Sequence, residues 1–273
     1  MSATKEERQD ALAGLRKWNL ERDDSGPYRV YRDKEDKIYY SVTTILKHTA
    51  PQKQKDALKK WLQRPNAEMQ GEIARNRGTM THEHCEYVLK TASKLARRSA
   101  NARNAWKIYE DGLARTSKAI TTWALKKSIE GAPKISWTCR EYARNLAPFL
   151  EEIAAIHASE FSVFHSDGWA GTADALIDYG KKTGTLTICD FKTSGSEKEK
   201  PDAFMQDYFD QLGAYSEALF EMVGIRPKKG VLAVVRQNGL QVREVSELEL
   251  LGATVRFRER LKVFKTLVAL GEV

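Results

Sequence analysis

Cysteine is scarce in this chain of 273 residues, and the three cysteines that occur are widely spaced. Cys85, Cys139 and Cys189 form neither a CxxC pair nor a disulfide framework, which excludes a disulfide-stapled scaffold and a zinc site of paired cysteines. They are also too few for a four-cysteine iron–sulfur cluster. We therefore expect a protein of a reducing cytoplasm.

Long apolar runs are missing as well. The densest short run, Val231–Val235, suits a buried strand, so no membrane-spanning segment is expected. The start, MSATKEERQD, has mixed charge and resembles neither a secretion signal nor a transit peptide. A phosphate-binding P-loop is absent too, because Ala175 and Lys182 occupy the positions in the YGKKT region where that motif needs Gly and Ser/Thr. This argues against an intrinsic helicase motor.

Acidic residues are sparse between Leu89 and Glu130. Ten basic and three acidic side chains give this 42-residue segment a net charge of +7, out of +8 for the chain. Aromatic residues are interleaved, so the segment could track a phosphate backbone while its rings stack on bases. The alternative is a solvated helix pair with its aromatic residues in the core, and composition alone favours that alternative. The candidate nucleic-acid contacts here are Arg97, Arg98, Arg103, Trp106 and Lys107.

The remaining composition is that of a globular protein, with 41% hydrophobic and 30% charged residues and a mean hydropathy of −0.55. Helical periodicity is predicted for Glu6–Leu20, most of 51–157, Asp202–Val223 and Glu247–Leu270. Strands are predicted at Tyr28–Arg32, Lys37–Val42, Ala158–Phe164, Trp169–Asp178, Thr185–Lys192, Val231–Arg236 and Leu240–Val245. This order predicts one α/β domain over 1–273, with a largely helical insertion at 51–157, a catalytic sheet core at 158–245 and a closing helix at 246–273.

The stretch GTADALIDYGKKTGTLTICDFKTS, residues 171–194, reads as a hairpin with its turn centred on Lys182. A ladder symmetric about that residue places Asp174 opposite Asp190, with Cβ atoms ~4.5–5.5 Å apart. Lys192 then projects from the same face as Asp190. Two facing carboxylates repel unless a proton or a divalent cation joins them, so the pattern indicates a metal site. The alternative is that Lys192 merely neutralises two half-exposed carboxylates at a sheet edge.

Three further elements accompany this hairpin in a fixed order. RGTMTHEHCE, residues 77–86, opens a helix that carries His82, and Glu160 lies in the strand before the hairpin. QLGAY places Gln211 and Tyr215 on one face of the helix that follows it. The series resembles the RecB branch of the PD-(D/E)XK nucleases over residues 37–88 and 155–220. Together with SVTTIL near the start, it is most similar to the mitochondrial genome maintenance exonucleases and their phage counterparts.

The resemblance implies a restriction-endonuclease-like core, a central mixed sheet flanked by helices, with Mg²⁺ or Mn²⁺ as cofactor. By analogy, His82, Asp174, Asp190 and the backbone carbonyl of Phe191 would coordinate the metal, and Lys192 would position and help deprotonate the attacking water. The remaining motif residues, Gln211, Tyr215 and Glu160, are expected to orient the lysine and the phosphate or to touch the metal region. Glu160 could equally be a strand-end charge, and Tyr215 plain core. Ala173 replaces the proline that gives the family its name.

Flanking residues are candidates for phosphate contacts. Arg75 and Arg77 lie just ahead of the histidine helix and would clamp phosphate groups. Ser41 and Thr43 could bind phosphate through their hydroxyls or cap the helix that follows, and capping is favoured.

The function implied by the resemblance is metal-dependent exonuclease activity on DNA, with single-stranded ends favoured, in replication, recombination or repair. Because no presequence is evident, we expect a phage or bacterial version, acting as a monomer in the bacterial or phage-infected cytoplasm. Phage recombination or replication proteins are conceivable partners, and no membrane association is expected. The alternatives are a double-strand-specific recombination exonuclease and a catalytically silent DNA-binding protein of the same fold.

Overall fold

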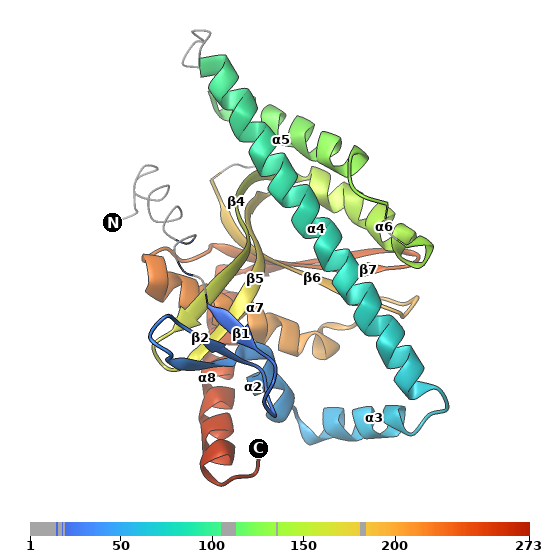
Figure 1. Ribbon diagram of the computed structural model, residues 1–273, viewed down its shortest axis with the longest axis vertical. Helices are drawn as coiled ribbons and strands as arrows, with labels where there is room; N and C mark the ends of the chain where they lie inside the picture. Colours follow the sequence, from blue (N-terminus) through green and yellow to red (C-terminus); the bar gives the residue numbers. More distant parts are fainter. Residues whose placement is uncertain (1–14, 16–17, 19, 105–112, 135, 181–183) are drawn as a thin grey trace.

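The computed structural model describes residues 15, 18, 20–104, 113–134, 136–180 and 184–273, with the side chains of 100–104, 113–117 and 137 excepted. The helix expected at Glu6–Leu20 lies largely outside the described residues. Within them, eight strands form one sheet in the order β1-β2-β3-β5-β6-β7-β8, with β4 pairing beside β5 (Figure 1). The β3–β5 and β6–β7 pairs are parallel and the other pairs are antiparallel, so the sheet is mixed, as predicted.

The strands are β1 (Glu21–Asp23), β2 (Val30–Arg32), β3 (Ile38–Ser41), β4 (Ile153–His165), β5 (Trp169–Tyr179), β6 (Leu186–Ser194), β7 (Lys229–Arg236) and β8 (Gly239–Ser246). The helices are α2 (Val42–His48), α3 (Gln52–Leu62), α4 (Ala67–Asn104), α5 (Leu113–Glu130), α6 (Arg140–Glu151), α7 (Gln206–Val223) and α8 (Glu247–Ala269). Short 3₁₀ turns are η3 (Trp137–Cys139) and η4 (Asp202–Phe204). No helix in the described part of the chain is long and apolar enough to span a bilayer.

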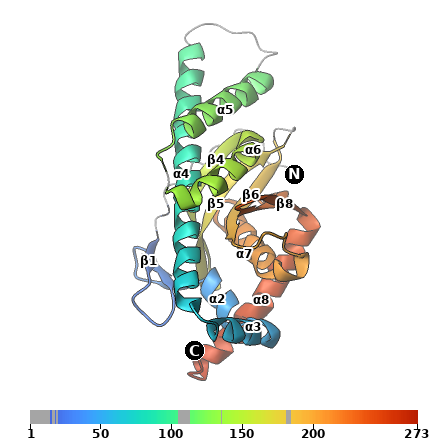
Figure 2. The same ribbon diagram turned by 90° about the vertical axis from the view of Figure 1, so that its right-hand side faces the viewer.

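Helices cover both faces of the sheet and bury two apolar clusters. One cluster joins Val88 and Leu89 of α4, together with residues of α5 and α6, to one face of β5, β6 and β7. The other joins α2, α7 and α8 to the opposite face, around Leu212 and Phe257. Figures 1 and 2 show α4 as the longest helix, crossing the sheet on the side away from α8. The sheet is therefore the middle layer of a three-layer arrangement, with helices on both of its faces.

One predicted boundary is wrong. The strand expected to begin at Ala158 begins at Ile153, and the helical region ends at Glu151 instead of residue 157. Two register irregularities, between Ile153 and Ala155 and between Ile156 and Ala158, interrupt the alternation at this end of β4. A β-bulge shifts side chains between faces, which hides the strand from a search for period two.

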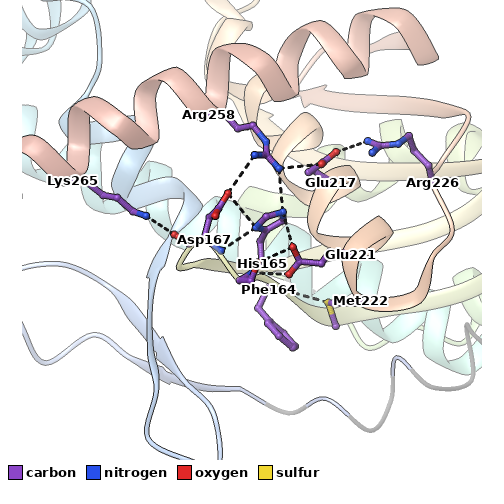
Figure 3. A network of polar contacts seen from close by, with 10 residues as sticks. Phe164, His165, Asp167, Glu217, Glu221, Met222, Arg226, Arg258 and Lys265 are labelled. Atoms are coloured by element: carbon purple, nitrogen blue, oxygen red, sulfur yellow. Dashed lines mark hydrogen bonds and ion pairs between the residues drawn. The ribbon is translucent and has the colours of Figure 1, made fainter.

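The turn between β4 and β5 is fastened to α7 and α8 by a polar network (Figure 3). His165 stacks on Trp169 with 3.9 Å between ring centroids, and its Nε2 lies 2.9 Å from Glu221 of α7. Arg258 of α8 reaches His165 at 3.2 Å and Glu217 of α7 at 3.1 Å. These contacts hold β5 in place against the two helices of this face.

Candidate active site

The site lies where β5 and β6 separate. Their antiparallel ladder runs from Asp178↔Leu186 to Ala175↔Cys189, which is the register that the turn symmetry predicts. Asp174 and Asp190 stand one step beyond the last of these pairs. From there β6 continues beside β7, whereas the same edge of β5 next pairs with β3, at Trp169 and Ala170. The two aspartates thus mark the mouth of a fork in the sheet.

Glu160 comes to the fork from the other side of β5. Its neighbours Ser159 and Phe161 pair with Ala175 and Ala173, which places Glu160 level with Asp174. Its φ of 45° is unusual for a residue other than glycine and interrupts the regular strand. Such backbone strain costs on the order of 1–3 kcal/mol and is concentrated at functional sites.

His82 completes a group of three potential metal ligands. It lies on α4 above the fork, with Nδ1 3.5 Å from Asp174 Oδ1. One ligand atom each from His82, Glu160 and Asp174 lie within 4.8 Å of one another. Two ligands of one small divalent ion are at most about 4.4 Å apart, since each bond is ~2.0–2.2 Å. The three side chains therefore need only a small adjustment to share a cation.

Asp190 is buried beside this group but is not part of it. Its Oδ2 is 2.5 Å from Lys192 Nζ, yet this oxygen has no partner of good hydrogen-bond geometry among the described residues. Its Oδ1 accepts a hydrogen bond from Gln211 Nε2 at 3.1 Å. The grouping found here includes Glu160, and the predicted ligand role of Asp190 stays a prediction. The ligand role of the Phe191 carbonyl stays a prediction, and the Phe191 amide donates to Asp174 Oδ2 at 2.7 Å.

Burial and crowding shift the pKa values of the acidic groups. Desolvation, followed by the charge of Asp174, raises the pKa of Glu160 to about 7. Desolvation also raises the pKa of Asp190 to about 6, against the opposing charge of Lys192. Desolvation would also raise the pKa of Asp174, but the contacts of this carboxylate with His82 and with the Phe191 amide outweigh desolvation and lower its pKa. The contact with Asp174 raises the pKa of His82, although burial of the imidazole would lower it. The ionised forms of Glu160 and Asp190 are therefore disfavoured at the fork, chiefly because both side chains are removed from water.

Lys192 is a cation in this arrangement. Burial alone would lower its pKa, but the charges of Asp190 and Asp174 outweigh burial and raise it. Its Nζ also lies 5.3 Å from the centroid of the Tyr208 ring. An ammonium group can donate hydrogen bonds to water or phosphate but cannot accept a proton. In this protonated form Lys192 can act as a hydrogen-bond donor, and its predicted role toward the attacking water stays a prediction.

Gln211 and Tyr215 occupy one face of α7, as predicted, and connect the fork to that helix. Gln211 Nε2 also donates to Tyr215 Oη at 3.2 Å, and both side chains are buried. The Tyr215 ring is packed so closely on β5 that a Cβ atom added at Gly171 would lie 2.5 Å from its Cε1. The glycine of the GTAD segment is therefore required for close approach of the tyrosine, which is more than a plain core residue.

The candidate phosphate contacts are dispersed. Arg77 packs over the Tyr142 ring at 5.3 Å, faces Gly195 just beyond the end of β6, and leaves its buried Nε without a partner among the described residues. Arg75 is exposed on α4. Ser41 is buried, and its hydroxyl lies 2.8 Å from that of Thr43. It occupies the N-cap position of α2 without a side-chain cap bond, so the expected capping interaction is wrong.

The basic helical segment is only partly described. Arg97 and Arg98 are exposed near the far end of α4. The side chains of Arg103, Trp106 and Lys107 lie outside the described residues. No contact brings this segment into the fork in the described part of the chain, and its predicted role in binding stays a prediction.

Sequence reasoning missed Tyr208 and Lys200. Lys200 Nζ donates to Tyr208 Oη at 2.9 Å, and the two ammonium groups of Lys192 and Lys200 both lie over the tyrosine ring. Tyr208 precedes Gln211 by three residues on α7, a helical spacing that would have indicated a common face.

Comparison with known proteins identifies the family. Residues 53–265 match the family model of the PD-(D/E)XK nuclease superfamily, so the chain belongs to this superfamily. No curated protein sequence matches it. Among solved structures, it is similar to a candidate exonuclease from Eubacterium rectale, with 14% identity, coverage of 71% of this chain and 85% of that one, and a TM-score of 0.38. It is also similar to the protein SSO0001, with 16% identity, coverage of 67% and 74%, and a TM-score of 0.29. Family membership rests on the sequence match.

The residues at the fork fit the divalent cation that nucleases of this superfamily generally use. An imidazole and two carboxylates converge, and a third buried carboxylate, that of Asp190, lies beside them. These are the features that a bound cation would compensate.

Proposed function

We propose that this nuclease is a divalent-metal-dependent DNA exonuclease of the RecB-like branch, related to the mitochondrial genome maintenance exonucleases and their phage counterparts. It would hydrolyse phosphodiester bonds at strand ends, preferably of single-stranded DNA, in phage or bacterial replication, recombination or repair. The observation that carries the proposal is the convergence of His82, Glu160 and Asp174 beside the Asp190–Lys192 pair.

In this proposal the residues divide the work of phosphodiester hydrolysis. Mg²⁺ or Mn²⁺, the latter favoured somewhat by the imidazole ligand, would polarise the phosphate and neutralise developing charge. His82, Glu160 and Asp174 would hold the ion, and Asp190, which is ion-paired with Lys192, lies beside them as a further candidate ligand. Lys192 would donate to the attacking water or to a phosphate oxygen. Its ion pair with Asp190, itself fixed by Gln211, would determine where the ammonium group points.

Arg77 has a matching role, and it lies within the histidine helix and not ahead of it as predicted, because α4 begins at Ala67. Arg77 lies on α4 with His82 and faces Gly195, just after β6, the strand that carries Lys192. Its guanidinium has no ion-pair partner in the described part of the chain and would bind a phosphate next to the scissile one. Arg75, Thr43 and the basic end of α4 remain candidates for contacts further along the strand.

A time course on end-labelled DNA tests this function. Linear single-stranded and duplex substrates, each labelled at either end, are incubated with Mg²⁺, Mn²⁺ or chelator. We expect mononucleotides or short products from the single strand, only with metal, and no cleavage of a circular single strand. Faster digestion of the duplex would favour a double-strand-specific recombination exonuclease. Absence of metal-dependent cleavage, together with retained DNA binding, would leave a silent binding protein.

A further inference from the structure

A groove leads from the active site along helix α3. Its inner part, about 380 Å³, is lined by residues of α2, α3 and α7, including Thr43, Tyr208 and Gln211. Its outer part, about 420 Å³, continues between α3 and the end of the chain, past Leu62 and Leu267. The two parts share three lining residues, Lys47, Lys55 and Leu58. Each part has the volume of pockets that enclose one small organic molecule, ~300–1,000 Å³.

The inner end of this groove borders the candidate active site. Gln211, which lines the groove, donates to Asp190 Oδ1 at 3.1 Å. Tyr208, the next lining residue on α7, has Lys192 Nζ over its ring at 5.3 Å. A chain molecule lying in the groove would therefore have one end beside the lysine and the fork.

The groove is positively charged and its lysines are unneutralised. Lys47, Lys55 and Lys59 line it, and in the described part of the chain no carboxylate forms an ion pair with any of them. Burial, and then the charges of Lys47 and Lys55, lower the pKa of His48 between them. The acids in the lining are Asp207, which is bound to Arg260 at 2.5 Å, and Glu272 at the outer end.

Helix α3 exposes apolar side chains along the groove. None of its residues is buried, and Leu58 and Leu62 expose 52% and 58% of their surface along the groove. Apolar side chains between unpaired lysines suit a ligand that offers both phosphates and the flat faces of bases. A duplex does not suit this volume, because it would bring a second strand and paired bases that no longer offer their faces to the lining.

We propose that this groove, between α3 and α2, α7 and the end of α8, is the path of a single DNA strand whose terminal phosphodiester lies at the fork. The proposal rests on the proposed exonuclease function and adds the route of the substrate. Lys47, Lys55 and Lys59 contact successive phosphates, and Leu58 and Leu62 contact the bases. The strand thus runs on the α3 side of the molecule, and the α4–α5 helices are not required for it.

The test is binding of a fluorescent single-stranded oligonucleotide to the triple variant Lys47→Gln, Lys55→Gln, Lys59→Gln. Chelator is present so that cleavage does not consume the probe. We expect affinity at low salt to fall on the order of tenfold, and the slope of log K against log salt to decrease by ~2, at ~0.7 for each lost phosphate contact. Binding of a duplex closed by hairpins at both ends should not change.

A matched control removes the same charge elsewhere. Lys228 and Lys229 are paired with Glu247 and Glu244, and Lys265 donates to the Asp167 carbonyl. The triple variant Lys228→Gln, Lys229→Gln, Lys265→Gln should bind the oligonucleotide with nearly the affinity and salt slope of the wild type. An equal loss of oligonucleotide affinity in both triple variants would show that the effect comes from net charge alone. That result would overturn the proposed path.

A second measurement separates this proposal from the proposed function. Thymidine 5′-(p-nitrophenyl phosphate) carries one nucleotide and does not reach the lysines, so its metal-dependent hydrolysis should be the same in the groove variant and the wild type. If the wild type cleaves no substrate, the proposed function is contradicted. The oligonucleotide-binding measurement in chelator would still test the path, because it does not depend on cleavage. Unchanged oligonucleotide binding by the groove variant of an active nuclease would overturn the path alone and point to an acidic protein as the occupant.

Discussion

Lys192 illustrates how much one side chain depends on its surroundings. Its side chain is half-buried, and its ammonium group is stabilised by Asp190, 2.5 Å away. Replacing it with Met removes a hydrogen-bond donor from the fork and leaves a buried carboxylate without its counterion. We expect cleavage of single-stranded DNA to slow by ~10²–10³-fold, the usual cost of removing one preorganised hydrogen-bond donor to developing charge. Oligonucleotide binding in chelator should change little, because the phosphates along the strand are bound elsewhere.

The arginine variant sharpens this prediction. Lys192→Arg keeps the charge, but a planar guanidinium is longer than an ammonium group and donates in a different geometry, so activity should not return. Activity of Lys192→Met within a few-fold of the wild type, in single-turnover kinetics, would contradict the assigned role.

Glu160 makes the stability of the metal-free protein depend on pH. Its folded-state pKa is about 7, above the ordinary value of 4.5. The favourable contribution of the protonated carboxyl is complete below 4.5 and is lost as pH rises through 7. Glu160→Gln keeps a neutral side chain at every pH. In chelator we expect the variant to match the wild type at pH 5 and to have the higher Tm at pH 8.

With saturating Mn²⁺ at pH 8, the wild type should have a higher Tm than Glu160→Gln. The carboxylate of the wild type then binds the metal, whereas the amide of the variant binds metal weakly. Thermal unfolding at both pH values, with chelator and with Mn²⁺, gives the four comparisons. A Glu160→Gln variant less stable than the wild type at pH 8 without metal would show that this carboxyl is not held at a raised pKa.

The close packing of α7 on β5 supports the site through Gly171. A methyl group at this position would lie 2.5 Å from Tyr215 Cε1 and 2.7 Å from its Oη, so the ring must move. That movement breaks the bond from Gln211 to Tyr215 and disturbs the bond from Gln211 to Asp190. We expect Gly171→Ala to lose about 1–3 kcal/mol of unfolding free energy, as in other overpacked cores, and most of its activity.

A second glycine provides the control for that variant. Gly252 is in the interior of α8, and an added Cβ would be 3.5 Å from Arg256 Nη1, an ordinary van der Waals contact. Gly252→Ala should gain about 0.5–1 kcal/mol from helix propensity and keep full activity. Urea unfolding and cleavage assays on both variants provide the comparison. Equal stability of the two variants would refute the close approach of Tyr215.

The elements also show how far sequence reasoning extends. Turn residues around Lys182 and the alternation of β5 and β6 predicted the register that aligns Asp174 with Asp190, because both signals are local. Helical spacing likewise placed Gln211 and Tyr215 on one face of α7. The position of Glu160 depends on a positive φ inside a strand, which no periodicity encodes. The α3 groove depends on how distant helices pack, so its lysines carried no signal in the sequence.

The charge balance of the fork should make the stability of the whole molecule depend on metal. An ion that binds only the folded chain stabilises it by about 2.7 kcal/mol at one hundred times its dissociation constant. For a chain of this size, that corresponds to a rise in Tm of roughly 5–10 °C. We therefore expect Mn²⁺ or Mg²⁺ to raise the Tm of the wild type and chelator to lower it, irrespective of any DNA cleavage.

Two histidine variants identify where the stabilising ion binds. His82→Ala removes one of the three converging ligands, so most of the metal-dependent rise in Tm should disappear. His157 is also half-buried and bound to an aspartate, Asp178 at 3.0 Å, but lies outside the fork. His157→Ala should have a lower Tm than the wild type in chelator and keep the full rise on addition of metal. A rise in Tm that survives in His82→Ala, or that disappears in His157→Ala, would mean that the ion binds elsewhere, and the chemistry assigned to His82, Glu160 and Asp174 would then be wrong.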